Sequence, residues 1–203
     1  MVPTQWFART QEYQRLFTGM IKDWREKWAE ELPFYFVQIA PFKYNPKAQS
    51  QGLRDAQRKT LNLEKTGMAI TMDIGEEDDI HPANKQDVGK RLARLALANV
   101  YGKSEVLASG PLYKSQQLYP LYIDLDFDYV GSGLKAKGVL RGFEIAGEDG
   151  VFHPAIAKII DNKVRVTSKK VKNPKRVRYG WENYFEATLF NKEGLPASSF
   201  QTP

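Results

Sequence analysis

Apolar residues recur at steps of three and four between residues 11 and 31, a spacing that predicts an amphipathic helix with one apolar stripe. Pro33 follows and indicates the end of this helix. The next apolar run, residues 34–40, is short and nearly continuous, which is typical of a buried strand in a parallel sheet. The stripe of the helix comprises Tyr13, Phe17, Met20, Ile21, Trp24, Trp28 and Leu32.

Helix and strand patterns continue to alternate along the first half of the chain. Residues 52–63 predict a weaker helix, residues 67–72 a second short strand, and residues 84–101 a third helix that Asn84 can cap. The third helix is expected to turn Val88, Leu92, Leu95 and Ala96 inward, and Gly102 stands where a C-cap is expected. This order of elements predicts a layered α/β domain over residues 1–103.

From residue 104 onward the pattern changes to short strands. Residues 119–129 alternate, with Leu121, Ile123, Leu125 and Phe127 on one face and Tyr122, Asp124, Asp126 and Asp128 on the other. This alternation predicts a half-buried antiparallel strand. Further strands are expected at residues 141–146, 155–160, 163–168 and 176–181, with turns at 131–133 and at Asp161-Asn162. Residues 104–203 are therefore expected to form a small β-sandwich.

Composition narrows the function without deciding it. The chain has no cysteine, which excludes disulfides and thiolate metal sites. Its 30 Lys and Arg against 24 Asp and Glu give a net charge of +6, which is too weak an excess to predict nucleic-acid binding. No apolar run approaches the length needed to cross a bilayer, and the first ten residues show no signal-peptide pattern. We therefore expect neither a nucleic-acid partner nor a membrane partner.

The acidic loop at residues 73–82 carries His81, one of only two histidines in the chain. This loop follows a predicted parallel strand, and functional residues of α/β sheets gather past such strand ends. A histidine that acts as a general base needs a carboxylate to orient its ring, and Asp78 and Asp79 lie three and two residues before it. The spacing alone fits a solvated acidic loop better than a catalytic one.

Residues 79–86, Asp-Ile-His-Pro-Ala-Asn-Lys-Gln, resemble the histidine block of the sialate O-acetylesterase branch of the SGNH hydrolases. Other blocks that resemble this family follow in order through almost the whole chain, from about residue 11 to the end. They are residues 16–28, 32–41, 53–57 and 66–75 in the first half, and 109–113, 131–134, 177–181 and 191–198 in the second. The chain therefore resembles the C-terminal portion of such a carbohydrate esterase.

The resemblance implies an enzyme that removes O-acetyl groups from sugars by Ser-His(-Asp) acyl transfer, without a metal or an organic cofactor. It implies a partial SGNH-type, flavodoxin-like α/β domain followed by a β-sandwich. His81 maps to the catalytic base. Its acid partner maps to Asp79, and Asp78, at the commoner SGNH spacing, stays beside it as the alternative. An O-acetylated sugar is the implied substrate, and secretion or a periplasmic location is the family habit.

The family's serine block, of the Gly-Gln-Ser-Asn type, is not found in these 203 residues. Ser50 follows Gln49 but lacks the glycine and asparagine, and residues 5–10 stand where the second oxyanion block is expected. We expect either a truncated reading of a longer gene or a degenerate homologue, and favour truncation because the remaining blocks keep their order. The chain alone is then expected to be inactive, with the missing N-terminal half as its partner.

Several other features have simpler interpretations. A sugar-binding β-module is the main non-enzyme alternative, but its aromatic residues more often form a core. A basic run is more often a solvated surface than an anion site, and His153 has no charged neighbour in sequence. The acidic run 76–79 lacks the spacing of a calcium loop. The aromatic residues are Tyr179, Trp181, Tyr184 and Phe185, and the basic run is Lys169, Lys170, Lys172, Lys175, Arg176 and Arg178.

Overall fold

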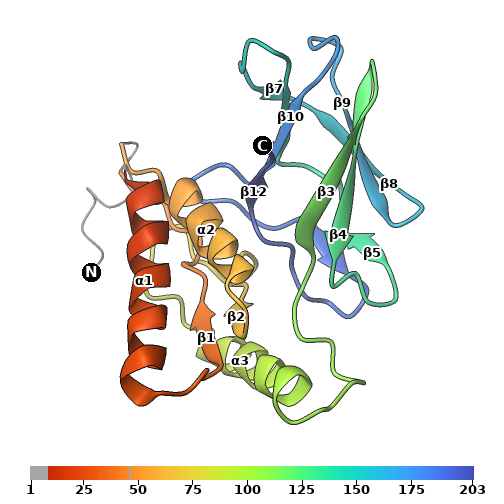
Figure 1. Ribbon diagram of the computed structural model, residues 1–203. Coiled ribbons are helices and arrows are strands. Elements are labelled where there is room, and N and C mark those ends of the chain that lie inside the picture. The colour runs from red at the N-terminus through yellow and green to blue at the C-terminus, as the bar shows by residue number, and fades with distance from the viewer. Residues whose placement is uncertain (1–8, 46) are drawn as a thin grey trace. The chain divides into compact units, whose positions relative to one another are not determined.

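The computed structural model describes residues 9–45 and 47–203, and their contacts divide the chain into two compact units (Figure 1). The first unit contains the chain up to Ser109 together with Glu182–Tyr184. The second contains Gly110–Trp181 and Phe185–Pro203. A short segment of the C-terminal half therefore belongs to the first unit, which the sequence pattern did not indicate.

The first unit is a mixed α/β structure built on one pair of parallel strands. Its elements are α1 (Thr10–Trp28), β1 (Phe34–Val37), α2 (Ser50–Lys59), the 3-10 turn η2 (Thr60–Asn62), β2 (Thr66–Ala69) and α3 (Lys85–Asn99). Strands β1 and β2 run parallel, with Phe34 opposite Thr66 and Val37 opposite Ala69. The three helices and two strands predicted for this region are all confirmed.

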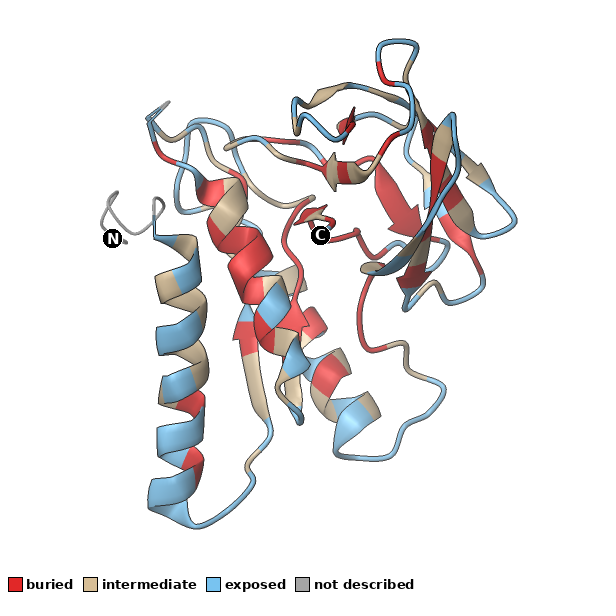
Figure 2. Ribbon diagram, turned by 45° about the horizontal axis from the view of Figure 1, so that its top comes forward, coloured by how far each residue is buried: buried red, intermediate tan, exposed pale blue. Residues whose placement is uncertain are grey.

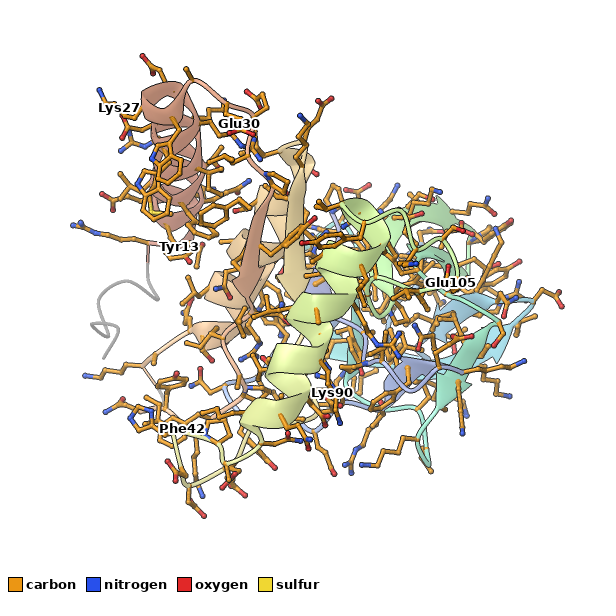
Figure 3. All side chains as sticks on the ribbon, turned by 90° about the horizontal axis from the view of Figure 1, so that it is seen from below. Tyr13, Lys27, Glu30, Phe42, Lys90 and Glu105 are labelled. Atoms are coloured by element: carbon orange, nitrogen blue, oxygen red, sulfur yellow. The ribbon has the colours of Figure 1, made fainter. Side chains whose placement is uncertain are left out.

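Helices α1 and α3 lie on opposite sides of this strand pair (Figure 3). Phe17 of α1 meets the rings of Phe34 and Phe36 edge-on, at centroid distances of 6.0 and 5.0 Å. On the other side α3 approaches β2 closely at Gly67, where a Cβ would lie 2.9 Å from Leu95. Strand β1 therefore presents phenylalanine rings to α1, while Gly67 of β2 leaves room for the close approach of α3.

The predicted apolar stripe of α1 is wrong at its C-terminal end. Ile21 is fully buried, but Trp24 and Trp28 are 53% and 71% exposed. The buried side chain in this last turn is instead Arg25, because its guanidinium donates to three backbone carbonyls, those of Leu32, Glu64 and Lys65. These bonds satisfy carbonyls of the two segments that lead into β1 and β2.

The second unit consists of short antiparallel strands, as predicted. They are β3 (Leu112–Leu118), β4 (Tyr122–Asp128), β5 (Leu134–Ala136), β6 (Phe143–Ala146), β7 (His153–Pro154), β8 (Ile156–Ile160), β9 (Lys163–Thr167), β10 (Arg176–Tyr179), β11 (Leu189–Asn191) and β12 (Phe200–Gln201). They pair in the orders β12-β10-β6-β7, β3-β4-β9-β8 and β11-β5. The positive φ angles of Asp161 and Asn162, 49° and 61°, confirm the predicted hairpin turn.

Strand β4 shows how alternation builds the core of this unit. Ile123 and Leu125 are fully buried and Phe127 nearly so, as predicted. Leu121 is 68% exposed and lies before the strand begins, so its predicted place on the buried face is wrong. Figure 2 shows buried positions along the strands of this unit. No helix in the part of the chain that the structure describes has both the length and the apolar character of a membrane span.

Candidate functional site on the loop after β2

The loop that carries His81 begins where β2 ends and leads into α3, and its first residues are clamped to that helix. Arg91 of α3 donates to both carboxylate oxygens of Asp73, at 2.6 and 2.7 Å, and to the carbonyl of Ile70 at 2.5 Å. The two side chains are only 9% and 15% exposed. A two-point, largely buried pair of this kind fixes orientation as well as distance, so the loop leaves the sheet in one direction.

The far end of the loop is fixed by the cap of α3. The side chain of Asn84 accepts a hydrogen bond from the backbone N–H of Asp87 at 3.1 Å, which confirms the predicted N-cap. Its amide donates to the Asp87 carboxylate at 2.9 Å, and this bond is the main reason that the pKa of Asp87 is lowered. A carboxylate in the first turn also suits the positive end of the helix dipole.

Between these anchors, carboxylates hold the backbone of the loop. Asp79 accepts a hydrogen bond from the backbone N–H of His81 at 2.7 Å, and Glu76 accepts one from Ala83 at 2.7 Å. The structure thus brings the Asp79 carboxylate to the backbone of His81 and not to its imidazole ring. Within the described residues neither Asp78 nor Asp79 is hydrogen-bonded to the imidazole, and all three side chains are exposed.

The loop after β1 packs beside the His81 loop. Lys43 donates its backbone N–H to the carbonyl of Glu77 at 3.0 Å, and its ammonium lies 3.0 Å from the Glu77 carboxylate. That carboxylate raises the pKa of Lys43. A Cβ at Gly75 would clash with the carbonyl oxygen of Pro41, so only glycine allows this approach. The loops that follow the two parallel strands therefore support each other.

A buried arginine fixes the start of α2. Arg54 is fully buried, and its guanidinium donates to Ser50 Oγ at 3.1 Å, to the carbonyl of Asn183 at 3.2 Å and to that of Glu182. Ser50 Oγ in turn donates to the side chain of Asn183 at 2.9 Å. Burial lowers the pKa of Arg54 to about 10. Ser50 is fully buried in this network, so its position suits structure and not nucleophilic attack.

One groove of the first unit has no residue of the His81 loop in its lining. A groove of about 680 Å³ is lined by residues of the last turns of α1 and of the segment before β2, among them Lys22, Arg25, Glu30 and Glu64. Figure 3 shows Glu30 and Phe42, on the loop after β1, at opposite ends of the unit. The groove contains charges of both signs, and the guanidinium of Arg25 is already hydrogen-bonded to the backbone carbonyl of Glu64. We therefore place the candidate site on the exposed His81 loop.

Two residues of this site were missed in the sequence, Asp73 and Arg91. They lie 18 positions apart, so no local spacing marks them as a pair. The hydrogen bond from the His81 N–H to the Asp79 carboxylate closes a turn that is typical of aspartate. The sequence could therefore have indicated this turn. No group of three or more histidine, aspartate and glutamate side chains in the described chain is arranged to hold a metal ion.

The prediction that the aromatic cluster is core is confirmed for Tyr179 and Phe185 only, because Trp181 and Tyr184 are half-buried and Tyr184 belongs to the first unit. Tyr179 is fully buried and Phe185 is 7% exposed. The hydroxyl of Tyr179 accepts the backbone N–H groups of Thr188 and Leu189 at 3.0 and 2.9 Å. In the basic run, Arg178 is paired with Glu144 at 2.7 Å. These contacts give Tyr179 and Arg178 structural roles.

No protein-family model matches this chain, and no curated protein matches it. Among solved structures it is similar to a carbohydrate acetylesterase from Xanthomonas citri, with 41% sequence identity and a TM-score of 0.88. The match covers 95% of this chain and 46% of that one, so the chain spans about half the length of this relative. The likeness supports the carbohydrate-esterase part of the predicted resemblance.

Proposed function

We propose that this chain is the C-terminal portion of a carbohydrate O-acetylesterase of the sialate O-acetylesterase type. The first unit would be part of an SGNH-type layered domain, and the second its following β-sandwich. The observation that carries the proposal is the 41% identity to a carbohydrate acetylesterase over 95% of this chain. The position of His81 on a supported loop past a parallel strand agrees with it.

His81 is the general base in this proposal. A serine oxygen attacks the acetyl carbonyl while the imidazole takes the serine proton, and the sugar hydroxyl leaves with that proton. Water then attacks the acetyl-enzyme by the same route and releases acetate. The imidazole is exposed and its loop is fixed at Asp73 and Asn84, so it can meet a second group without the loop refolding.

The serine in this proposal comes from polypeptide outside these 203 residues, because the family's serine block does not occur in them. Ser50, which follows Gln49, is buried in the Arg54 network. The chain by itself should therefore show no enzyme-like turnover of p-nitrophenyl acetate. Robust turnover that a serine-directed inhibitor abolishes would contradict this part of the proposal.

A chimera tests the whole proposal. This chain would replace the matched part of the Xanthomonas citri esterase, and acetate release from acetylated sugars would be measured. We expect activity in the chimera and its near-complete loss on His81→Ala, because the nucleophile loses its base. His153→Ala is the matched control, since that histidine belongs to strand β7 of the second unit, and it should keep activity.

Substrate choice tests the finer part of the proposal. The active chimera should release acetate faster from O-acetylated sialic acid than from an acetylated neutral sugar. The reverse preference would keep the esterase and refute the sialate type. A folded chimera that releases acetate from neither substrate would refute the esterase itself.

A further inference from the structure

The two parallel strands of the first unit differ in how well they are covered. Strand β2 is buried at every position after Thr66, and the carbonyl of Ile70, just past the strand, accepts a hydrogen bond from Arg91. In β1 only Phe36 is buried, and Val37 is 37% exposed. Parallel sheets are normally covered throughout, so the side of β1 that faces away from β2 is where this sheet is incomplete.

The outer edge of β1 presents backbone groups that no strand satisfies. Phe34 and Gln38 donate their backbone N–H groups to the segment that contains β2. In a parallel ladder the residues between them bond in the opposite direction. The N–H and C=O of Tyr35 and the N–H of Val37 therefore point outward. Within residues 9–45 and 47–203, β2 is the only strand beside β1.

A side chain closes the far end of this edge. The amide oxygen of Gln57 accepts the N–H of Ile39 at 2.9 Å, and its nitrogen donates to the carbonyl of Val37 at 3.3 Å. A glutamine amide carries both a donor and an acceptor, so here it takes the place of a neighbouring strand. The stretch that remains open runs from Tyr35 to the N–H of Val37.

Helix α1 extends its apolar surface past β1. Leu16 and Trp24 stand eight residues apart, a spacing that puts them on one side of a helix, and they are 45% and 53% exposed. The Trp24 ring meets Phe34 of β1 edge-on, with ring centroids 5.8 Å apart. Trp28, one turn later, is 71% exposed. Exposed tryptophans beside an open strand edge are typical of a surface that another polypeptide covers.

The order of elements indicates which polypeptide that is. Neighbouring parallel strands are joined by a helix that packs on the sheet, as α2 joins β1 and β2. Helix α1 enters β1 in the same way, through residues 29–33, but no strand precedes it in the described part of the chain. A crossover helix in this place packs partly on the strand before it. The apolar stripe of α1 is therefore wider than the two strands beneath it.

We propose that the outer edge of β1, together with the side of α1 that bears Leu16, Trp24 and Trp28, docks an apolar parallel strand from the N-terminal half of the esterase. The proposal rests on the function proposed above and adds the place and direction of the contact. The similar Xanthomonas citri chain has room for such a half, since the match covers 46% of it. Because the docked strand runs parallel, its carboxyl end lies at the sheet edge from which the His81 loop leaves.

Amide hydrogen exchange followed by NMR tests the edge residue by residue. In the chain alone the N–H groups of Tyr35 and Val37 should exchange fast, whereas that of Phe36, which bonds toward β2, should exchange slowly. In the chimera, exchange at Tyr35 and Val37 should slow about a hundredfold or more, because exchange then requires local opening of a paired strand. Phe36 is the internal control and should stay protected in both proteins.

Trp24→Lys tests the helix side of the surface. In the chain alone it should leave the melting temperature almost unchanged, because this side chain is 53% exposed. In the chimera it should lower the melting temperature by several degrees, since the lysine would be buried against the docked strand. Val100→Lys is the matched control, at a position 52% exposed at the end of α3, and it should be harmless in both proteins.

The outcomes separate this surface from the esterase function. An active chimera in which Tyr35 and Val37 stay unprotected, or in which Trp24→Lys is harmless, would refute the docking surface and leave the esterase. A chimera that is protected at both amides but releases no acetate would refute the esterase and keep the surface. A folded chimera with neither property would refute both. Protection in the chain alone that rises with its concentration would assign the surface to a second copy of this chain and overturn the proposal.

Discussion

Replacing Arg91 by alanine should both destabilise the first unit and release the loop that carries His81. The change removes two bonds to the Asp73 carboxylate and one to the Ile70 carbonyl. It also leaves the Asp73 carboxylate, which is 15% exposed, without its partner. Breaking a buried ion pair at one side costs about 3–5 kcal/mol, because an uncompensated charge stays behind.

We expect a loss of about 3 kcal/mol, at the lower end of that range, since Asp73 keeps some contact with water. Urea denaturation followed by helical circular dichroism measures it, because all three described α-helices belong to the first unit. A double-mutant cycle with Asp73→Ala should show coupling, as residues in one ion pair are not additive. In the active chimera, Arg91→Ala should also lower turnover, because the loop that carries His81 is no longer fixed.

Lys90→Ala is the matched control on the same helix. Its pair with Asp87 is 3.4 Å long, and the two side chains are 61% and 38% exposed. Such surface pairs contribute less than about 1 kcal/mol, so this variant should unfold almost like the parent. The opposite result is that Arg91→Ala lowers the free energy of unfolding by less than about 1 kcal/mol, as the loss of a surface pair does. That result would show that the Arg91–Asp73 pair does not fix this loop.

Three other predictions follow from single residues. Asn84→Ala should cost about 0.5–2 kcal/mol through loss of the cap. It should also raise the lowered pKa of Asp87 toward its ordinary value, as an NMR titration would show. Because the pKa of Asp87 is lowered in the folded chain, its carboxylate contributes folding stability that is present above the unfolded pKa and is lost as pH falls through the folded pKa. Asn84→Ala should therefore lose less stability than the parent when the pH is lowered. Tyr179→Phe should cost about 2–4 kcal/mol in the melt of the second unit, because two buried N–H groups lose their acceptor. Gly142→Ala should be more damaging than Gly138→Ala, since both have positive φ but only at Gly142 would the Cβ clash with a ring, that of Phe185.

Each of these has a result that would refute it. An unchanged Asp87 titration in Asn84→Ala would show that another group lowers that pKa. A Tyr179→Phe melt equal to the parent's would mean that water satisfies the two N–H groups. Equal loss in the two glycine variants would mean that backbone strain alone, and not the clash, decides the cost.

Periodicity recovered the first unit well because its helices and parallel strands are long or apolar enough to leave a pattern. It failed where arginine is buried. Arg25, Arg54 and Arg91 are 6%, 0% and 7% exposed, yet hydropathy treats arginine as a surface residue. Their partners are mostly backbone carbonyls far along the chain, as with Arg54 and Asn183. No local pattern could therefore reveal them.

The second unit was recovered less completely for a different reason. Strands β7 and β12 have two residues each, and β5 and β11 have three. Such segments are too short for a period of two to repeat. Strand β3 has seven residues but was also not predicted, because its sequence, Leu-Tyr-Lys-Ser-Gln-Gln-Leu, does not alternate apolar and polar residues. Strand β4, with seven residues, was predicted with the correct buried face apart from Leu121.

The histidine of the candidate site was predictable from sequence, while the role of its neighbouring carboxylates was not. Spacing predicts only that Asp78 and Asp79 can reach the His81 imidazole. The structure commits one oxygen of Asp79 to the His81 backbone. Residues 5–8, part of the segment that stands in place of the expected oxyanion block, lie outside the described residues.

The acid partner of His81 can be decided by separating the two properties of a carboxylate, its charge and its acceptor oxygen. In the active chimera, Asp79→Asn keeps an acceptor for the His81 N–H but removes the charge, whereas Asp79→Ala removes both. If Asp79 orients the imidazole, as we predict, Asp79→Asn should already lower turnover by orders of magnitude. Asp78→Asn, on the same exposed loop, should then change little. If instead Asp79 serves only the backbone turn, Asp79→Asn should be nearly silent and only Asp79→Ala harmful, which would refute the pairing. A large loss of turnover in Asp78→Asn alone would show that Asp78, three residues before His81, orients the imidazole. Mild effects of both asparagine variants would point to a backbone carbonyl as the group that orients His81.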